Sequence, residues 1–305
     1  MGNGAGPQAR TPNPVLEERM DTKTKRRIAV VTDSTAYMPQ HLLDQYRIHV
    51  VPVMLIMGGK MWRDGVDIDP PAFYELLKAG KDFPTTSQPN SAAFEELFVK
   101  LAEDHEGIIV VTVTSDLSGT YASAMAAKAN LPHIPIEVVD SRGVTMQIGF
   151  PVVAAAQAAD AGGDLQSVAD AARALIGKTH LYFVVGTLEY LKRGGRIGKA
   201  AWLLGSALDL KPILQLKDGV IAPAAKVRTR RKALDMLYGM IGELIPAGSR
   251  VHMSVINIAT PDEAAELKEQ MLARYHPVEM VEAECSPAIG AHGGPGTVGV
   301  AFYVE

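Results

Sequence analysis

Three short runs that are expected to form strands end in hydroxyl or Asp-Ser residues, at 32–35, 114–118 and 140–141. Residues 108–113, which precede the second group, are all β-branched, and such a run is typical of a strand buried on both faces. A turn and a run of small helix-forming residues follow it. A junction of strand, turn and helix directs unpaired backbone N–H groups and the positive end of the helix dipole toward one point. A carboxylate or a phosphate would be stabilised there, with Ser118 as a further donor.

A single serine at such a place would be no more than a helix N-cap, so the recurrence of the pattern is what points to a binding site. Strands alternate with helices along the first half of the chain, which predicts a parallel α/β sheet. In such sheets ligands bind beyond the carboxyl ends of the strands. We also expect one strand at 49–57, helices at 39–46 and 92–103, and a hydroxyl-rich loop at 84–91.

The composition changes after Phe150, where Ala-rich and Gly-rich segments begin. We therefore predict a disordered N-terminal extension at 1–26, an N-terminal α/β domain at 27–150 and a C-terminal α/β domain at 151–305. In the second domain, Asp218-Gly219 between two apolar runs predicts a β-hairpin. The other elements expected there are helices at 152–161, 165–176, 200–210 (buried), 232–245 and 262–275, strands at 181–185, 250–258 and 300–304, and a Gly/Pro-rich loop at 286–299.

The composition is that of a globular protein, because 47% of the 305 residues are hydrophobic and 21% are charged. No apolar run approaches the length of a transmembrane helix, and the first 25 residues lack the apolar core of a signal peptide. Met20 offers an alternative start. Cys285 is the single cysteine, so no internal disulfide can form, which favours a reducing cytoplasm.

The net charge of −4 is distributed unevenly along the chain. Residues 192–232 contain eleven Lys or Arg against two acids, a local charge of +9, and the rest of the chain therefore sums to −13. Such a basic segment indicates an anionic ligand or an acidic partner protein. The alternative is a solvated face of helix and loop.

Several kinds of site are disfavoured by the spacing of the residues. The eight histidines show no His-x-x-x-His spacing and the lone cysteine no Cys-x-x-Cys, so we expect no metal site. The sequence Gly194-Gly-Arg-Ile-Gly198 resembles neither a P-loop nor a dinucleotide fingerprint, and we expect no cofactor. The basic segment lacks interleaved aromatic residues and the whole chain is acidic, which disfavours nucleic-acid binding.

A hydrolase is the alternative enzymatic hypothesis. Ser118, an aspartate such as Asp33 and His292 could form a triad, and Cys285 with His292 is a second nucleophile–base pair. No Gly-x-Ser-x-Gly elbow surrounds Ser118, and the His292-Gly-Gly-Pro segment lies too late in the chain for the oxyanion loop of an esterase. A lone cysteine is usually a buried small hydrophobe.

Together these segments carry a resemblance to the DegV family, and they occur in that family's order from about residue 28 to the end. The segments are Thr32-Asp-Ser-Thr35, Arg63-Asp-Gly-Val-Asp-Ile68, Thr86-Ser-Gln-Pro89, Leu117-Ser-Gly-Thr-Tyr121, Asp140-Ser141, Gly186-Thr-Leu-Glu-Tyr-Leu-Lys-Arg-Gly-Gly-Arg-Ile197 and Gly290-Ala-His-Gly-Gly-Pro-Gly296. The chain departs from the family pattern at Asn90, where Ser is common, and at Ala36-Tyr37, where a Ser-Asp pair is usual.

The resemblance implies a bacterial, cytoplasmic protein that is not an enzyme by itself. It implies a two-domain α/β fold, with a parallel sheet in the N-terminal domain and a mixed α/β C-terminal domain, that holds a long-chain fatty acid between its domains. The fatty acid's carboxylate would be presented to a partner fatty acid kinase, with at most transient membrane contact. The implied carboxylate contacts are Thr86, Ser118 and His292, with Ser87, Gly119 and the turn at Ser34 nearby, and the implied kinase contacts are Arg193, Arg196 and Arg228.

Overall fold

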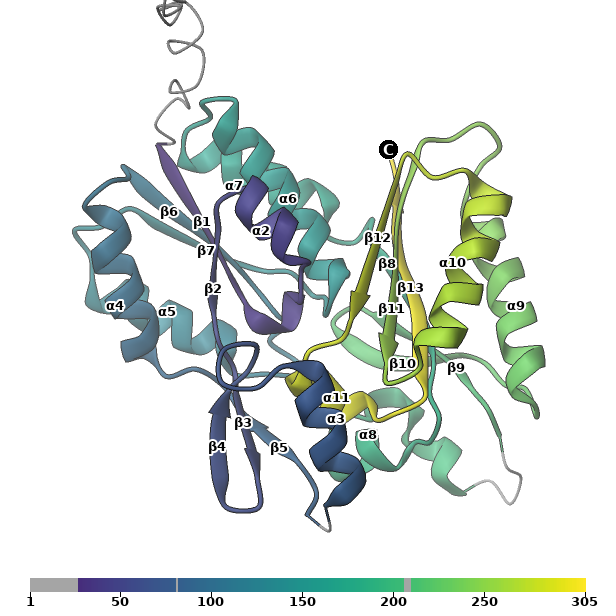
Figure 1. The fold of residues 1–305 in the computed structure, drawn as a ribbon. Helices are drawn as coiled ribbons and strands as arrows, with labels where there is room; N and C mark the ends of the chain where they lie inside the picture. The colour runs from purple at the N-terminus through teal and green to yellow at the C-terminus, as the bar shows by residue number, and fades with distance from the viewer. Residues whose placement is uncertain (1–26, 81, 206–209) are drawn as a thin grey trace, which may run out of the picture.

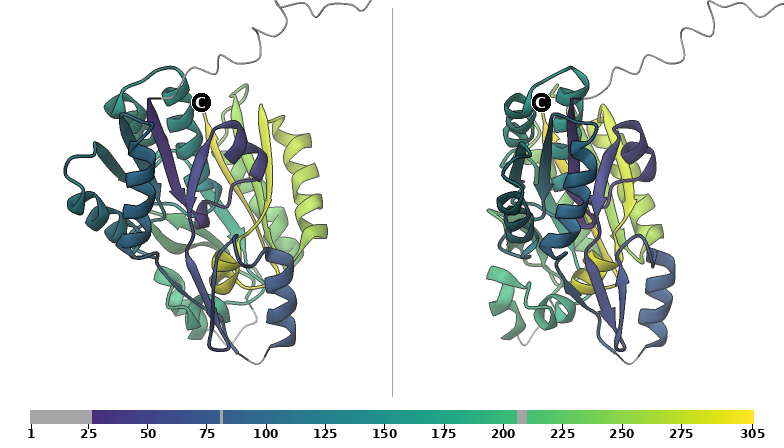
Figure 2. Two further views of the ribbon diagram at one scale, coloured as in Figure 1. Left: turned by 60° about the vertical axis from the view of Figure 1, so that its left-hand side comes forward. Right: turned by 90° about the vertical axis from the view of Figure 1, so that its left-hand side faces the viewer.

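The computed structural model describes residues 27–80, 82–205 and 210–305, and the extension predicted at 1–26 lies outside this range. Two large β-sheets stand side by side, each with helices on its outer face (Figures 1 and 2). A smaller three-stranded sheet lies at one end of the pair. Within the described residues, no helix is long and apolar enough to cross a membrane.

The first sheet is parallel, as the alternation of strands and helices predicted. Its strands are β1 (Ile28–Asp33), β2 (Ile48–Val51), β6 (Gly107–Thr112) and β7 (Ile136–Asp140), in the order β2-β1-β6-β7. Alternate side chains of a strand point to opposite faces. Ala29 and Val31 therefore pack toward α4 (Ser91–Ala102) and α5 (Thr120–Asn130), while Ile28 and Val30 join a second core on the other face.

That second face carries α6 (Met146–Asp160) and α7 (Leu165–Leu175), which pack on β1, β6 and β7. The boundary expected at 150/151 therefore falls inside α6. The Ala-rich composition that suggested a new domain reflects close packing of these helices, because Ala155, Ala156 and Ala159 are all buried. We propose that the N-terminal unit continues through α7.

The second sheet is mixed and has the order β10-β9-β8-β13-β11-β12. Helices α9 (Arg230–Glu243) and α10 (Pro261–Tyr275) cover its outer face, where Val255 is buried. Its inner face turns Leu181, Phe183 and Ile256 toward the first sheet. The strands are β8 (His180–Val184), β9 (Ile213–Lys217), β10 (Val220–Ala225), β11 (Val251–Ile258), β12 (Glu279–Glu284) and β13 (Thr297–Val304).

The small sheet corrects the prediction of one strand at 49–57. Residue Pro52 has no N–H to donate to a ladder, and the run divides there. Its first part is β2, and its second part, β3 (Met54–Met57), pairs antiparallel with β4 (Lys60–Arg63) and β5 (Thr85–Ser87). The segment expected as a loop at 84–91 thus contains a strand. The remaining elements of this half are η1 (Ser34–Ala36), α2 (Gln40–Gln45) and α3 (Pro70–Ala79).

Two expectations for the second half were also wrong. The segment predicted as a buried helix at 200–210 forms the 3-10 helix η2 (Gly198–Gly205), in which Leu203 is buried but Trp202 is 52% exposed. Residues 206–209 lie outside the described range. The loop expected at 286–299 contains α11 (Pro287–Gly293), which begins with Ser286 as N-cap and a proline at N1. The short helix α8 (Glu189–Arg193) lies near it.

Candidate ligand-binding site

The turns after β1 and β6 meet where the order of the parallel sheet reverses. From β1 the chain goes to β2 on one side, and β6 lies on the other, which makes a crevice of the kind that binds ligands in open α/β sheets. Asp33 joins the two turns, because it is fully buried and accepts hydrogen bonds from Thr35 N (3.0 Å) and Val113 N (2.7 Å). Burial raises the pKa of this carboxyl, against the opposing effect of its hydrogen bonds.

A cavity extends from this crevice between the two sheets. The cavity has a volume of about 110 Å³, taken as the space open to the centre of a water molecule. Most of its lining is apolar, which suits a hydrophobic ligand. The apolar part of the wall comes from both halves of the protein, and includes Val53, Val113, Val144, Leu181, Phe183, Leu191, Leu216, Ile221, Ile256 and Ile258.

Polar side chains gather where the wall is only partly buried. Thr86, Ser118 and His292 line the cavity and are each half-buried, whereas Val113 and Leu181 farther along the wall are buried. The Oγ1 atom of Thr86 and the Nε2 atom of His292 lie 2.7 Å apart in a hydrogen bond. Three residues that are far apart in the sequence, on β5, in the turn after β6 and on α11, thus form the cavity mouth.

Helix α11, which carries His292, is fixed in place from the N-terminal half. The Asp64 carboxylate accepts hydrogen bonds from Ala288 N (3.1 Å), in the first turn of α11, and from Ser34 Oγ (2.7 Å). The hydroxyl of Tyr74 donates to the carbonyl of Cys285, just before the helix (3.0 Å). Burial raises the pKa of Asp64 to about 6. These contacts hold His292 beside Thr86 across a separation of 206 residues.

The imidazole of His292 is neutral near pH 7. Burial, and secondarily the positive charge of Arg196, lower its pKa to about 4. The Nδ1 atom has no hydrogen-bond partner among the described residues, and it packs against Gly194 so closely that a Cβ there would lie 2.2 Å from it. A ring with one uncharged N–H orients the Thr86 hydroxyl rather than acting as a cation.

Replacing Gly194 with alanine is expected to displace this ring. Gly194 has φ −70°, which alanine adopts without strain, so the clash with His292 is the main effect. The pKa of His292 should rise from about 4 toward its usual 6.5, because the ring would become solvated. An NMR titration of the His292 ring protons measures this pKa. Gly239→Ala is the matched control, since nothing lies within 4 Å of a Cβ there. An unchanged His292 pKa in Gly194→Ala would contradict the packing.

Arg196 completes the mouth, and a hydrogen bond to a buried neighbour positions Ser118. The Oγ atoms of Ser118 and Thr120 share a hydrogen bond of 2.9 Å at the start of α5. Arg196 lines the cavity and donates from Nε to Leu117 O (3.1 Å) and from Nη1 to Gly194 O (2.6 Å). Arg196, which is predicted to contact a partner protein, links the Ser118 turn to the segment that packs on His292, and it brings positive charge to the mouth.

The other predicted residues lie elsewhere. Ser34 does not line this cavity, because its hydroxyl donates to Asp64 and accepts from Val53 N (3.0 Å). Ser87 follows Thr86 on a strand and so points to the opposite face. Gly119 is the N-cap of α5, beside Gln88. Arg193 and Arg228 are exposed, and Arg193 pairs with Glu189 (2.6 Å).

Sequence reasoning missed four polar residues of the wall, Thr35, Gln88, Thr145 and Thr297. Thr35 and Gln88 are the neighbours of the predicted site residues Ser34 and Ser87. Side chains of successive residues point in different directions, and this decides which neighbour faces the cavity. No local pattern marked Thr145. Asn90, a departure from the family pattern, caps α4 by accepting from Ala93 N (2.9 Å), as a serine could.

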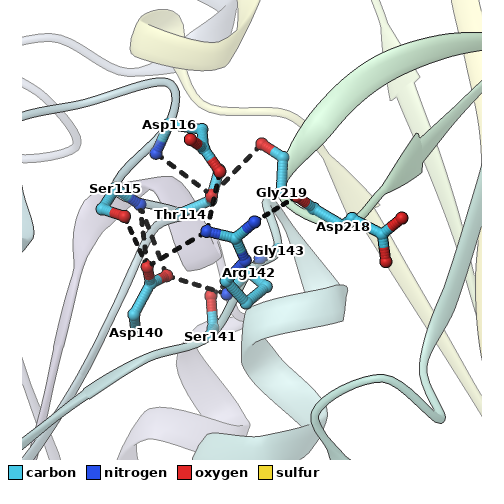
Figure 3. Close-up of polar contacts among 9 residues, drawn as sticks. All are labelled: Thr114, Ser115, Asp116, Asp140, Ser141, Arg142, Gly143, Asp218 and Gly219. Atoms are coloured by element: carbon cyan, nitrogen blue, oxygen red, sulfur yellow. Dashed lines mark hydrogen bonds and ion pairs between the residues drawn. The ribbon is translucent and has the colours of Figure 1, made fainter.

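The third strand end, at 140–141, does not line the cavity. The residues around it bind the Asp218-Gly219 turn of the other half, and we call this set of contacts the clasp (Figure 3). The β9–β10 hairpin, whose Asp218-Gly219 turn was predicted, reaches the first sheet there. Arg142 pairs with Asp116 (2.7 Å) and donates to the carbonyl of Asp218, while Thr114 Oγ1 donates to the carbonyl of Gly219 (3.1 Å). The same hairpin contributes cavity-wall residues, so the clasp holds part of the wall closed.

The geometry does not favour the hydrolase hypothesis. His292 bonds to Thr86 and Ser118 to Thr120, and both oxygens of Asp33 are engaged by the turns after β1 and β6. Cys285 is buried, which raises the pKa of its thiol well above the usual range and disfavours the thiolate.

Comparison with known proteins agrees with this architecture. A model of the DegV family, described as an uncharacterised protein family, matches residues 27–305. A DegV domain-containing protein of Streptomyces coelicolor is 38% identical over 277 residues, which are 90% of this chain and 98% of that protein.

Solved structures show the same fold. A fatty-acid-binding DegV family protein from Thermus thermophilus is 32% identical, with a TM-score of 0.87 over 92% of this chain and 100% of that one. DegV of Bacillus subtilis, a fatty acid binding protein, is also 32% identical, with a TM-score of 0.86 over the same shares. From the family match, the sequence identity and the shared fold together, this chain is a member of the DegV family.

Proposed function

We propose that this protein binds a long-chain fatty acid in the interdomain cavity and presents the carboxylate to a partner fatty acid kinase. The observation that carries the binding proposal is an apolar cavity between the two sheets, with Thr86, Ser118 and His292 among the partly buried residues of its wall. The fatty-acid-binding relatives from Thermus thermophilus and Bacillus subtilis support the same ligand class.

The acyl chain would supply most of the affinity. Burying roughly fourteen methylene groups at about 0.8 kcal/mol each gives on the order of 11 kcal/mol, before the costs of ordering the ligand and the protein. Hydrogen bonds to a charged carboxylate contribute about 1.5–3 kcal/mol each, and they specify orientation more than affinity.

The head group would be held as a carboxylate. In our proposal the neutral His292 donates from Nε2 to Thr86, which leaves the Thr86 hydroxyl proton for the ligand, and Ser118 donates from the other side of the mouth. Arg196 adds a positive charge close by. Hydrogen bonds and positive charge favour the ionised form of an acid, which is the nucleophile that phosphoryl transfer requires.

Kinase presentation is the finer part of the proposal, and the family resemblance implies it. A half-buried Arg196 at the mouth and an exposed Arg193 at the end of α8, three residues earlier, support it, because their positive charge suits an acidic protein surface or a nucleotide phosphate. The exposed Arg228 is the third proposed contact.

Lipid extraction tests the binding proposal. Protein purified from bacteria, then denatured and extracted, is expected to release a long-chain fatty acid in a near-stoichiometric amount by mass spectrometry. Val113→Phe would fill the buried wall of the cavity and should abolish the retained lipid, whereas Val99→Phe, at a site 49% exposed on α4, should not. Folded wild-type protein that carries no fatty acid and takes none up would contradict the proposal.

A further inference from the structure

One hydroxyl in the apolar wall of the cavity has no partner. Thr145 is 2% exposed and lines the cavity, and its Oγ1 atom makes no hydrogen bond with any described residue. Other buried side-chain atoms in the described part of the chain also lack partners, but Thr145 carries the one hydroxyl among them that borders this cavity. A buried hydroxyl without a partner is destabilising, so its presence here requires an explanation.

The backbone around Thr145 turns this hydroxyl away from its usual local partners. Thr145 is the N-cap residue of α6, a position at which threonine normally accepts a hydrogen bond from the helix, but its side chain makes no capping bond. The backbone carbonyls of Val144 and Thr145 accept from Gln147 N (3.1 Å) and Ile148 N (2.8 Å) instead.

The conformation is also strained. Thr145 has φ 53° and ψ −140°, a region that β-branched residues rarely occupy, and its N–H is held by the carbonyl of Thr35 (3.0 Å). Strained residues of this kind are concentrated at ligand-binding sites. The neighbouring hydroxyls of the wall differ, because Thr35 donates to Asp33 and Thr297 donates to the carbonyls that end α11.

From these observations we infer that the cavity accommodates a fatty acid with a hydroxyl group part-way along its chain, which Thr145 recognises. This inference rests on the proposed function and names the class of acyl chain. Each hydroxyl can donate to or accept from the other, so both polar groups would be satisfied inside an apolar wall. A chain whose hydroxyl lies at another position would bury it without a partner and bind more weakly.

The test compares positional isomers of hydroxystearic acid as competitors of radiolabelled stearate on delipidated full-length protein. For the wild type, we expect one position, or two adjacent ones, to bind at least about tenfold more tightly than the others. Thr145→Val, which keeps the β-branched shape, should remove this maximum while stearate still binds. Thr145→Ser should keep it, and thermal melting shows whether each variant is folded.

The outcomes separate the two proposals. If stearate binds but affinity does not depend on the position of the hydroxyl, or if the maximum survives in Thr145→Val, the inference about Thr145 is wrong and the proposed function stands. If neither stearate nor any hydroxystearate binds to the wild type, the proposed function fails and the inference fails with it. A wild-type maximum that Thr145→Ser retains and Thr145→Val lacks would establish the recognition.

Discussion

The double variant Thr86→Val, Ser118→Ala is expected to still bind fatty acid, but a fatty acid kinase should form acyl phosphate from it about 100-fold more slowly. The reason is a division of roles along the ligand. In the proposed complex, the chain is held by the apolar walls of two sheets, while the carboxylate is oriented by two hydroxyls that line the cavity, from β5 and the turn after β6. Affinity measured by competition should also fall, because two hydrogen bonds of about 1.5 kcal/mol each correspond to roughly 100-fold. Phosphorylation is therefore compared at saturating fatty acid, where burial of the chain still fills the cavity.

The matched control is Ser87→Ala. Ser87 lies beside Thr86 on β5 but points to the other face, so its removal should leave both binding and phosphorylation intact. Thermal melting of the double variant should show only a small loss of stability. Part of that loss comes from the hydrogen bond that Ser118 shares with Thr120 at the start of α5. If the double variant is phosphorylated as fast as the wild type, these hydroxyls do not orient the carboxylate.

Replacing Gly219 with alanine is expected to destabilise the protein by roughly 3 kcal/mol, because two separate costs add. Gly219 has φ +82°, a left-handed conformation that glycine adopts freely and alanine does not. A Cβ there would also lie 2.5 Å from Thr114 Oγ1 and 2.6 Å from Asp116 Oδ2. The hairpin would have to leave the clasp of Figure 3, which opens one wall of the cavity. Chemical denaturation measures the loss.

Gly248→Ala isolates the contribution of the backbone. Gly248 has φ +79°, close to that of Gly219, but nothing lies within 4 Å of a Cβ there. This control is expected to lose only about 1–2 kcal/mol, the cost of the left-handed conformation. Retained fatty acid should also dissociate faster from Gly219→Ala than from Gly248→Ala. Equal stability losses in the two variants would show that the clasp does not hold the hairpin.

The local elements of this protein could be predicted because their signals lie close together in the sequence. The apolar run at 28–31 and the β-branched run at 108–113 become buried parallel strands, since each has apolar residues on both faces. Asp218-Gly219 forms a hairpin turn because glycine supplies the left-handed conformation that it needs. The ordered motifs, which no single pattern explains, were sufficient to indicate the family and hence the two-domain fold.

The tertiary structure decided which of those residues meet. Thr35 faces the cavity and Ser34 does not, because Asp64, thirty residues away, binds the Ser34 hydroxyl. His292 reaches Thr86 because Asp64 also binds the first turn of α11.

The sequence by itself therefore determined the buried parallel strands, the Asp218-Gly219 hairpin turn, the hydroxyl-bearing segments and the family. The tertiary structure alone decided the direction of each hydroxyl, the place of Arg196 at the mouth and the unpartnered Thr145. The physical reason is the sequence separation of the interacting residues, since strand and turn formation depends on residues a few positions apart. The orientation of a buried polar group depends on partners that only the folded chain brings within hydrogen-bonding distance.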